Sequence, residues 1–211
     1  MLTDKQMQDN KDKFIALIRS IKREGFDPER LIAKLCNSDF FTAPASTKFH
    51  CSFEGGLCQH SLNVYANLVW LASEKADTVD ADFDEDSLKI VALLHDISKM
   101  NTYEKTFKNT KLYHENGSKY DGNGNFDWVS VAGWSTKENR FVYGSHEMTS
   151  EYIVRQFIPL TLEESTAILH HMGGRNWDSA QDDICKVFSC YPLAFMLHTA
   201  DMLATYADEV N

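Results

Sequence analysis

The sequence has few positively charged residues for its size. Its 211 residues include 21 Lys and Arg against 31 Asp and Glu, which gives a formal net charge of −10. Proteins that bind duplexes or long strands neutralise phosphates with Lys and Arg, so this balance makes a long nucleic acid an unlikely partner. A small phosphate ester remains compatible with the charge, because a bound metal ion can supply the positive charge at its site.

Long apolar runs and paired cysteine motifs are also missing. No stretch approaches the roughly 20 apolar residues of a membrane span, and the first residues have no apolar leader core. The five cysteines are odd in number and form no Cys-x-x-Cys pair, which favours reduced thiols over a disulfide framework or a zinc ribbon. We therefore expect a cytoplasmic protein with no membrane association.

Apolar residues recur at helical spacing over most of the chain, which predicts an all-α bundle. A proline after Asp27 and a capping-box pattern from Thr161 to Glu164 mark two of the helix starts. The first helix is expected over residues 4–24, ended by Gly25. Further helices are expected to begin near residues 28, 56, 87, 146, 162 and 192.

Residues 103–145 have a different composition, rich in Tyr, Trp, Asn, Gly and Lys. Residues 126–131 and 140–143 have the composition of two strands of a small β-hairpin. We interpret this segment as an insertion beside the active site and the whole chain, residues 1–211, as a single domain. Residues 1–43 would be an N-terminal helical extension and residues 44–207 the core.

The pair His95-Asp96, near the end of a predicted helix, is the most informative motif. Neighbouring helical residues point about 100° apart, so a metal bound by both needs further ligands from elsewhere. His60 and Asp201 are candidates on two other predicted helices. Asp201 has apolar neighbours, and a buried carboxylate is costly unless it is paired or binds a cation. Alone, each residue has an ordinary structural explanation; the combination predicts a metal centre.

The order His60, His95-Asp96 and Asp201, each on its own predicted helix, resembles the HD superfamily of metal-dependent phosphohydrolases. The segment from His95 to Lys99 is similar to the family's His-Asp-x-Gly-Lys form, with Ser98 in place of glycine. The resemblance covers about residues 44–207 and implies an HD-domain helical bundle with these four residues as metal ligands.

Two local segments extend the resemblance. Residues 53–60, Phe-Glu-Gly-Gly-Leu-Cys-Gln-His, and the pair His170-His171 are similar to the HD domains of certain bacterial 3′-to-5′ exoribonucleases and of uncharacterised bacterial and phage proteins. In two-metal HD proteins, Asp96 would bridge the ions, and His146 with His170 or His171 would complete the second site. We favour two ions, and His171 over His170. The alternative is one ion, with the histidine in a last helical turn offsetting the helix dipole.

Imidazole and carboxylate ligands together suit Mn²⁺, Fe²⁺, Co²⁺, Ni²⁺ or Zn²⁺ better than Mg²⁺ or Ca²⁺. Lys99 lies one helical turn after His95, so it is a candidate catalytic contact to the phosphate, beside Asp96; a solvated lysine is the alternative. Further candidate substrate contacts are His50, Lys48, Tyr143, Arg175 and Trp177. His198, three residues before Asp201, is a candidate partner that would support a metal ligand.

The expected function is hydrolysis of a phosphomonoester or phosphodiester, in a nucleotide or similar small substrate, by a metal-activated hydroxide. A short-oligonucleotide exonuclease falls within this expectation. Two alternatives stay open: an HD-fold di-iron oxygenase, which the resemblance also allows, and a nucleotide sensor without catalysis. The sequence leaves the substrate, the metal and the oligomeric state undetermined.

Overall fold

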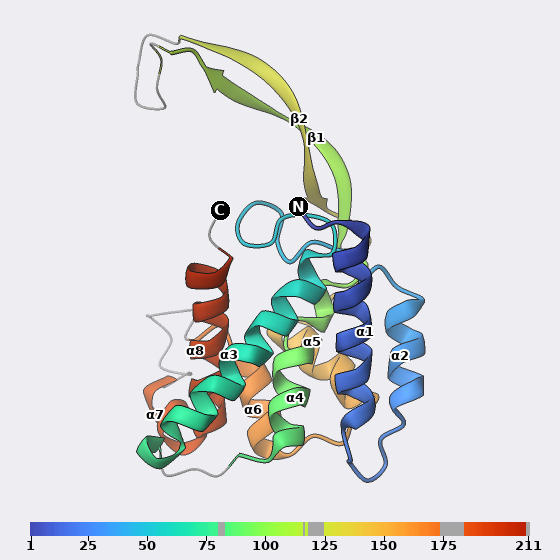
Figure 1. The fold of residues 1–211 in the computed structure, drawn as a ribbon, viewed down its shortest axis with the longest axis vertical. Helices are drawn as coiled ribbons and strands as arrows, with labels where there is room; N and C mark the ends of the chain where they lie inside the picture. The colour runs from blue at the N-terminus through green and yellow to red at the C-terminus, as the bar shows by residue number, and fades with distance from the viewer. Residues whose placement is uncertain (80–82, 116, 118–124, 174–183, 210–211) are drawn as a thin grey trace.

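The computed structural model describes residues 1–79, 83–115, 117, 125–173 and 184–209. In this part of the chain, helices form a body from which one β-hairpin projects (Figure 1). The helices are α1 (Asp4–Ser20), α2 (Pro28–Cys36), α3 (Gly56–Val79), α4 (Glu85–Leu94), α5 (His146–Arg155), α6 (Leu162–His170), α7 (Ile184–Cys190) and α8 (Pro192–Leu203). A 3₁₀ turn, η1 (Ile97–Lys99), follows α4, and a π-helical turn, η2 (Ala204–Asp208), extends α8.

Local capping signals explain most of the helix starts. The side chain of Asp27 caps α2, whose first residue is Pro28, and Thr161 caps α6 in a capping box, as the sequence predicts. The first helix ends earlier than expected, at Ser20. The backbone is already extended at Ile21, with φ −67° and ψ 124°, so the turn at Gly25 follows a short linker.

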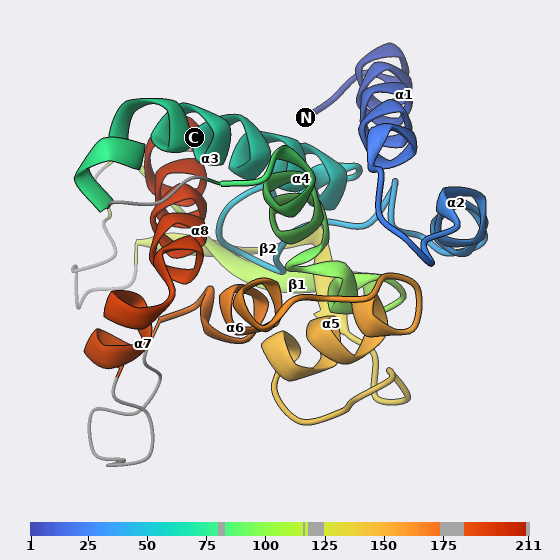
Figure 2. The same ribbon diagram turned by 90° about the horizontal axis from the view of Figure 1, so that it is seen from below.

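The core lies between α3, α4, α6 and α8, which pack on one another, while α1 and α2 cover one flank (Figure 2). Leu68, Ile90, Ile168 and Leu197 are fully buried in this core. Burying such side chains contributes roughly 1.5–3 kcal/mol each, which holds together four of the five helices around the candidate site.

The insertion forms the hairpin of β1 (Tyr103–Tyr113) and β2 (Phe126–Thr136), paired antiparallel. The all-α class with a hairpin inside residues 103–145 is thereby confirmed, and so is a strand over residues 126–131. The second expected strand, over residues 140–143, is wrong: those residues are not in a strand, and the rings of Phe141 and Tyr143 lie 6.0 and 4.4 Å from that of Tyr152 in α5.

No single helix in the described part of the chain is long and apolar enough to cross a membrane; only α7 joined to Pro192–Asp208, across a bend of 112°, has the length and composition.

Candidate metal centre

Six histidine and aspartate side chains from five helical segments meet inside the body. They come from the second turn of α3, the two residues after α4, the start of α5, the residue after α6, and α8. All are buried except His146, which is half-buried. The six are His60, His95, Asp96, His146, His171 and Asp201.

Asp96 divides the cluster into two sides. Its Oδ2 lies 3.6 Å from His60 Nε2 and 3.4 Å from His95 Nε2. Its Oδ1 lies 3.8 Å from His146 Nε2 and 3.7 Å from His171 Nε2. One carboxylate oxygen therefore faces each pair of imidazoles, as a carboxylate between two ions would.

Asp201 completes the first side of the cluster. Its Oδ1 lies 3.2 Å from His60 Nε2, and His60 Nε2 lies 3.3 Å from His95 Nε2. Donor atoms of His60, His95 and Asp96 lie within 4.8 Å of one another, and so do those of Asp96, His146 and His171. Both sets have the spacing of ligands around an ion.

Hydrogen bonds at the outer ring nitrogens orient the imidazoles. His95 Nδ1 lies 2.9 Å from the carbonyl oxygen of Ala92, and His171 Nδ1 lies 2.8 Å from that of Ile168. In each case the carbonyl belongs to the residue three positions earlier. A carbonyl only accepts, so Nδ1 carries the proton and Nε2 presents its lone pair inward. His60 Nδ1 lies 3.1 Å from a Glu209 carboxylate oxygen, which selects the same tautomer. Such outer partners are typical of metal-binding histidines.

The donor set fits a bound cation. Asp96 Oδ1 and His171 Nε2 are buried and have no hydrogen-bond partner among the described residues, a costly state for polar atoms. Burial disfavours a charged His60, but hydrogen bonds with Asp201 and Glu209 outweigh it and raise the pKa of His60 to about 9. At pH 7 His60 would therefore carry a proton on Nε2 as well as on Nδ1, and a metal cation at Nε2 would replace that proton beside the same carboxylates.

The loop before α3 brings a further histidine to the centre. A Cβ on Gly56 would lie 2.0 Å from the carbonyl oxygen of Cys51, so only glycine allows the loop to close against the helix start. The closed loop places the ring of His50 4.7 Å from that of His60. Burial lowers the pKa of His50 to about 4, so this ring is neutral at pH 7.

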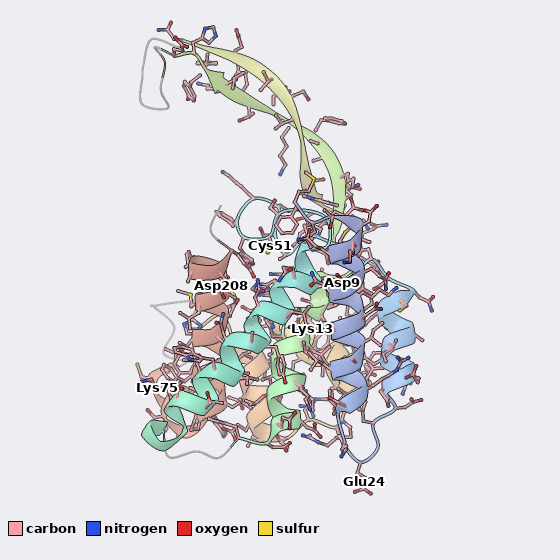
Figure 3. The ribbon with its side chains drawn as sticks, in the orientation of Figure 1. Asp9, Lys13, Glu24, Cys51, Lys75 and Asp208 are labelled. Atoms are coloured by element: carbon pink, nitrogen blue, oxygen red, sulfur yellow. The ribbon has the colours of Figure 1, made fainter. Side chains whose placement is uncertain are left out.

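Figure 3 shows Cys51, next to His50 in this loop, and Asp208 at the end of the body from which the hairpin rises.

Two cavities adjoin the centre. One, of about 360 Å³, is lined by Asp96, Lys99 and His50 and by residues of the insertion, including Tyr103 and Arg140. The other, of about 620 Å³, is lined by loop residues 48–50 and by residues of α8 and η2. His50 and Asp201 line both. The insertion therefore forms part of the wall of the site, as the sequence predicts.

Lys99 contacts the central carboxylate. Its Nζ lies 2.6 Å from Asp96 Oδ2. Burial raises the pKa of Asp96, but Lys99 and His95 outweigh this and hold it well below its ordinary value.

Ser98, where the family has glycine, accepts a hydrogen bond at 2.9 Å from Ser150 of α5. This bond connects the η1 turn with the helix that carries His146.

The sequence model of the HD domain family matches residues 57–210. This chain belongs to the HD domain family. The matched segment contains all six clustered residues and the hairpin, while α1 and α2 precede it. HD domains are generally metal-dependent phosphohydrolases, and the buried cluster of this HD domain can hold metal. No curated protein and no solved structure matches the chain.

The remaining candidate residues have different positions. His170, the last residue of α6, belongs to none of the donor groups found among the described residues, whereas His171 does. Tyr143 stacks on Tyr152 and does not line either cavity. His198 supports the centre indirectly, since its Nδ1 lies 2.7 Å from the carbonyl of His171. Lys48 lines the larger cavity, and Arg175 and Trp177 lie outside the described residues.

Sequence reasoning missed Glu209 and Arg140. Glu209 follows the π-helical turn η2, which departs from the 3.6-residue period of an α-helix, so helical periodicity alone does not predict where its side chain lies. Arg140 is exposed in the segment after β2 and reaches the cavity because the hairpin returns the chain to its base. A carboxylate near the end of the chain and an arginine in the insertion were the available signals, and neither is specific.

Proposed function

We propose that this HD domain hydrolyses a phosphomonoester or phosphodiester of a nucleotide or similar small substrate, with a divalent transition metal as cofactor. The observation that supports it is the two-sided arrangement around Asp96, which has two imidazoles at each carboxylate oxygen. Beside it lies an open cavity that Lys99 and Arg140 help to line. The distribution of donors favours two ions over one.

In this proposal the ligands fall into two groups that share Asp96. His60, His95 and Asp201 would hold one ion, and His146 and His171 the other. Bound ions of this kind lower the pKa of water and stabilise charge on phosphoryl oxygens.

The cavity side chains would bind and orient the ester. Lys99 and Arg140 supply two positive charges, which suit the non-bridging oxygens of a phosphate group. The Nε2 atom of His50 is buried and has no hydrogen-bond partner among the described residues. Since His50 is neutral at pH 7, it can donate a hydrogen bond from Nε2 to an ester oxygen without adding charge, in the tautomer that carries its proton on Nε2.

A metal and ester screen tests the proposal. Protein loaded with Mn²⁺, Fe²⁺, Co²⁺, Ni²⁺ or Zn²⁺ is assayed on nucleoside monophosphates, cyclic nucleotides and nitrophenyl phosphate mono- and diesters. The wild type should turn over at least one ester. Asp96→Ala, which removes a ligand from both groups, should have no activity, whereas Asp12→Ala on the exposed side of α1 should match the wild type.

Two results would contradict the proposal. Equal turnover by Asp96→Ala would place the activity elsewhere. A complete lack of ester hydrolysis, together with iron content and oxygen consumption, would favour the oxygenase alternative.

A further inference from the structure

The two faces of the hairpin differ in chemistry. Directly paired residues share a face and alternate along each strand, and the register runs without a break from Tyr103↔Thr136 to Tyr113↔Phe126. One face combines six aromatic rings with two lysines and has no Asp or Glu. We call it the aromatic–lysine face; its rings and lysines are Tyr103, Lys105, Phe107, Lys111, Tyr113, Phe126, Trp128 and Trp134.

The acidic residues of the two strands, Glu104 and Asp127, both lie on the opposite face. In a chain with a net charge of −10, this separation leaves an aromatic surface whose own charged residues are two lysines. Lys105 pairs with Glu54 of the loop before α3, at 2.9 Å, whereas Lys111 lies over aromatic rings of the hairpin. Such a surface is suited to a ligand that is flat and negatively charged.

Some of these rings stabilise the hairpin itself. Lys111 Nζ lies 3.9 Å from the ring centroid of Phe126 and 5.6 Å from that of Trp128, and such pairs support an isolated ribbon. Phe107 is different, because it pairs across the strands with Ala132 and is 76% exposed. Trp128 remains 64% exposed. Phe107 therefore offers an exposed ring to an outside ligand, and Trp128 keeps most of its surface exposed although it also contacts Lys111 and Phe126.

The aromatic–lysine face continues into the proposed active site. Tyr103 and Thr136, the pair at the base of this face, both line the cavity beside Asp96 and Lys99. From that base the ribbon extends away from the helical body (Figure 1). A ligand lying along the face would thus have one end at the metal centre.

We propose that single-stranded nucleic acid binds along the aromatic–lysine face and presents a phosphodiester near its end to the metal centre. This inference rests on the proposed phosphohydrolase function. Bases stack on exposed rings without sequence preference, and lysines neutralise phosphates. Hydrolysis would add water across one P–O ester bond and leave a phosphate monoester and a free hydroxyl group.

The test compares the two faces of one ribbon. Binding of fluorescently labelled homopolymeric RNA and DNA oligonucleotides is measured by anisotropy with the full chain in a chelating buffer, which prevents turnover. Phe107→Ala and Trp128→Ala should each weaken binding about tenfold, the scale of losing one stacked base. The controls Leu112→Ala and Val131→Ala remove exposed apolar side chains from the opposite face and should bind like the wild type.

Lysine variants and fluorescence add independent readouts. Lys111→Ala should weaken binding and make the slope of log K against log salt concentration about 0.7 less steep. Lys108→Ala, on the opposite face, should change this slope less. Bound oligonucleotide should quench tryptophan fluorescence through Trp128. Trp128→Phe keeps an aromatic ring and should restore binding, which separates stacking from a folding defect.

The possible failures are distinguishable. Equal losses from both faces, or no binding by a wild type that hydrolyses small esters, would overturn the inference and leave the proposed function intact. A change from dimer to monomer in Phe107→Ala, without a change in oligonucleotide affinity, would make the face a self-association surface and also overturn it. If no ester is hydrolysed while the face still binds oligonucleotide, the proposed function fails, and with it the link to the metal centre.

Discussion

The helical body and the hairpin are stabilised in opposite ways. In the body, the candidate ligands other than His146 are buried. The Nδ1 atoms of His95 and His171 are fixed by carbonyls of their own segments, and that of His60 by the Glu209 carboxylate. In the hairpin, cross-strand pairs provide the order, and large rings remain exposed. Substitutions of buried residues in the body should therefore change stability or metal binding, whereas substitutions of exposed residues on the hairpin should change ligand binding.

The strongest effect on folding should come from the buried ion pair that joins α6 to the α1–α2 linker. Glu164 is fully buried, and both its oxygens accept hydrogen bonds from Arg23, at 2.6 and 3.0 Å. Glu164→Ala would leave Arg23 without this partner and lower the free energy of unfolding by about 3–5 kcal/mol. Urea unfolding of this variant measures the change.

The surface pair between Arg19 and Glu29 is the matched control, because Glu29→Ala should give no measurable change in the same experiment.

The stabilisation by the Arg23–Glu164 pair should also depend on pH. Burial raises the pKa of Glu164, but hydrogen bonds from Arg23 and Ser87 outweigh this and lower it below its ordinary value. Its contribution is therefore complete above about pH 4.5 and lost as the pH falls through the folded-state pKa. An acid unfolding limb of the same shape in Glu164→Gln would contradict this account.

Lys99→Ala should reduce turnover strongly without unfolding the body. The substitution removes one positive charge from the cavity wall, and losing one charge-stabilising group costs about 10²-fold in kcat. Metal content should not fall, since Lys99 contacts Asp96 but is not a ligand. Steady-state kinetics and elemental analysis of the same preparation check both points. Loss of metal in this variant would mean that Lys99 has a structural role at the centre.

Glu209→Gln should weaken metal binding to a smaller extent. Glu209 also accepts a hydrogen bond from Asn63 at 2.9 Å, so glutamine can keep the geometry while losing the charge that favours a cation beside His60. Outer partners of this kind contribute about 10–100-fold to metal affinity. The neighbouring Asp208→Asn changes the same charge at an exposed position and should leave the affinity unchanged in a metal titration. Equal effects in both variants would indicate a general electrostatic field.

The smallest effect should be that of Trp128→Ala on overall stability. Because Trp128 is 64% exposed on the ribbon, its removal should change the free energy of unfolding by no more than about 0.5 kcal/mol. Amide exchange should be faster in the hairpin than in α3 and α8, which lie in the core. A Tm lowered by several degrees would show that the hairpin stabilises the body.

The sequence was sufficient to predict the helical class, because apolar periodicity and caps such as Asp27 and Thr161 act locally. It also predicted the family, because His60, His95-Asp96 and Asp201 occur in a specific order. The second strand was misplaced because Phe141 and Tyr143 have strand-like composition, but their rings pack on Tyr152 of α5. Tertiary packing of this kind has no local signal.

The site was only partly predictable for the same reason. The order of the residues gave candidate ligands, and the structure brings six of them together; their role as ligands stays a prediction. The choice between His170 and His171 depends on which side of the last turn of α6 faces Asp96, so sequence could favour one but not decide. Glu209 depends on an irregular turn and gave no motif.

The adjacent histidines at the end of α6 offer the most direct test of the metal centre. Metal content is measured by elemental analysis after saturation and removal of free ions, for the wild type, His171→Ala and His170→Ala. The account predicts bound transition metal in the wild type, a clear loss in His171→Ala, and wild-type content in His170→Ala. A wild type that retains no metal, or a His171→Ala variant that retains all of it, would contradict the account.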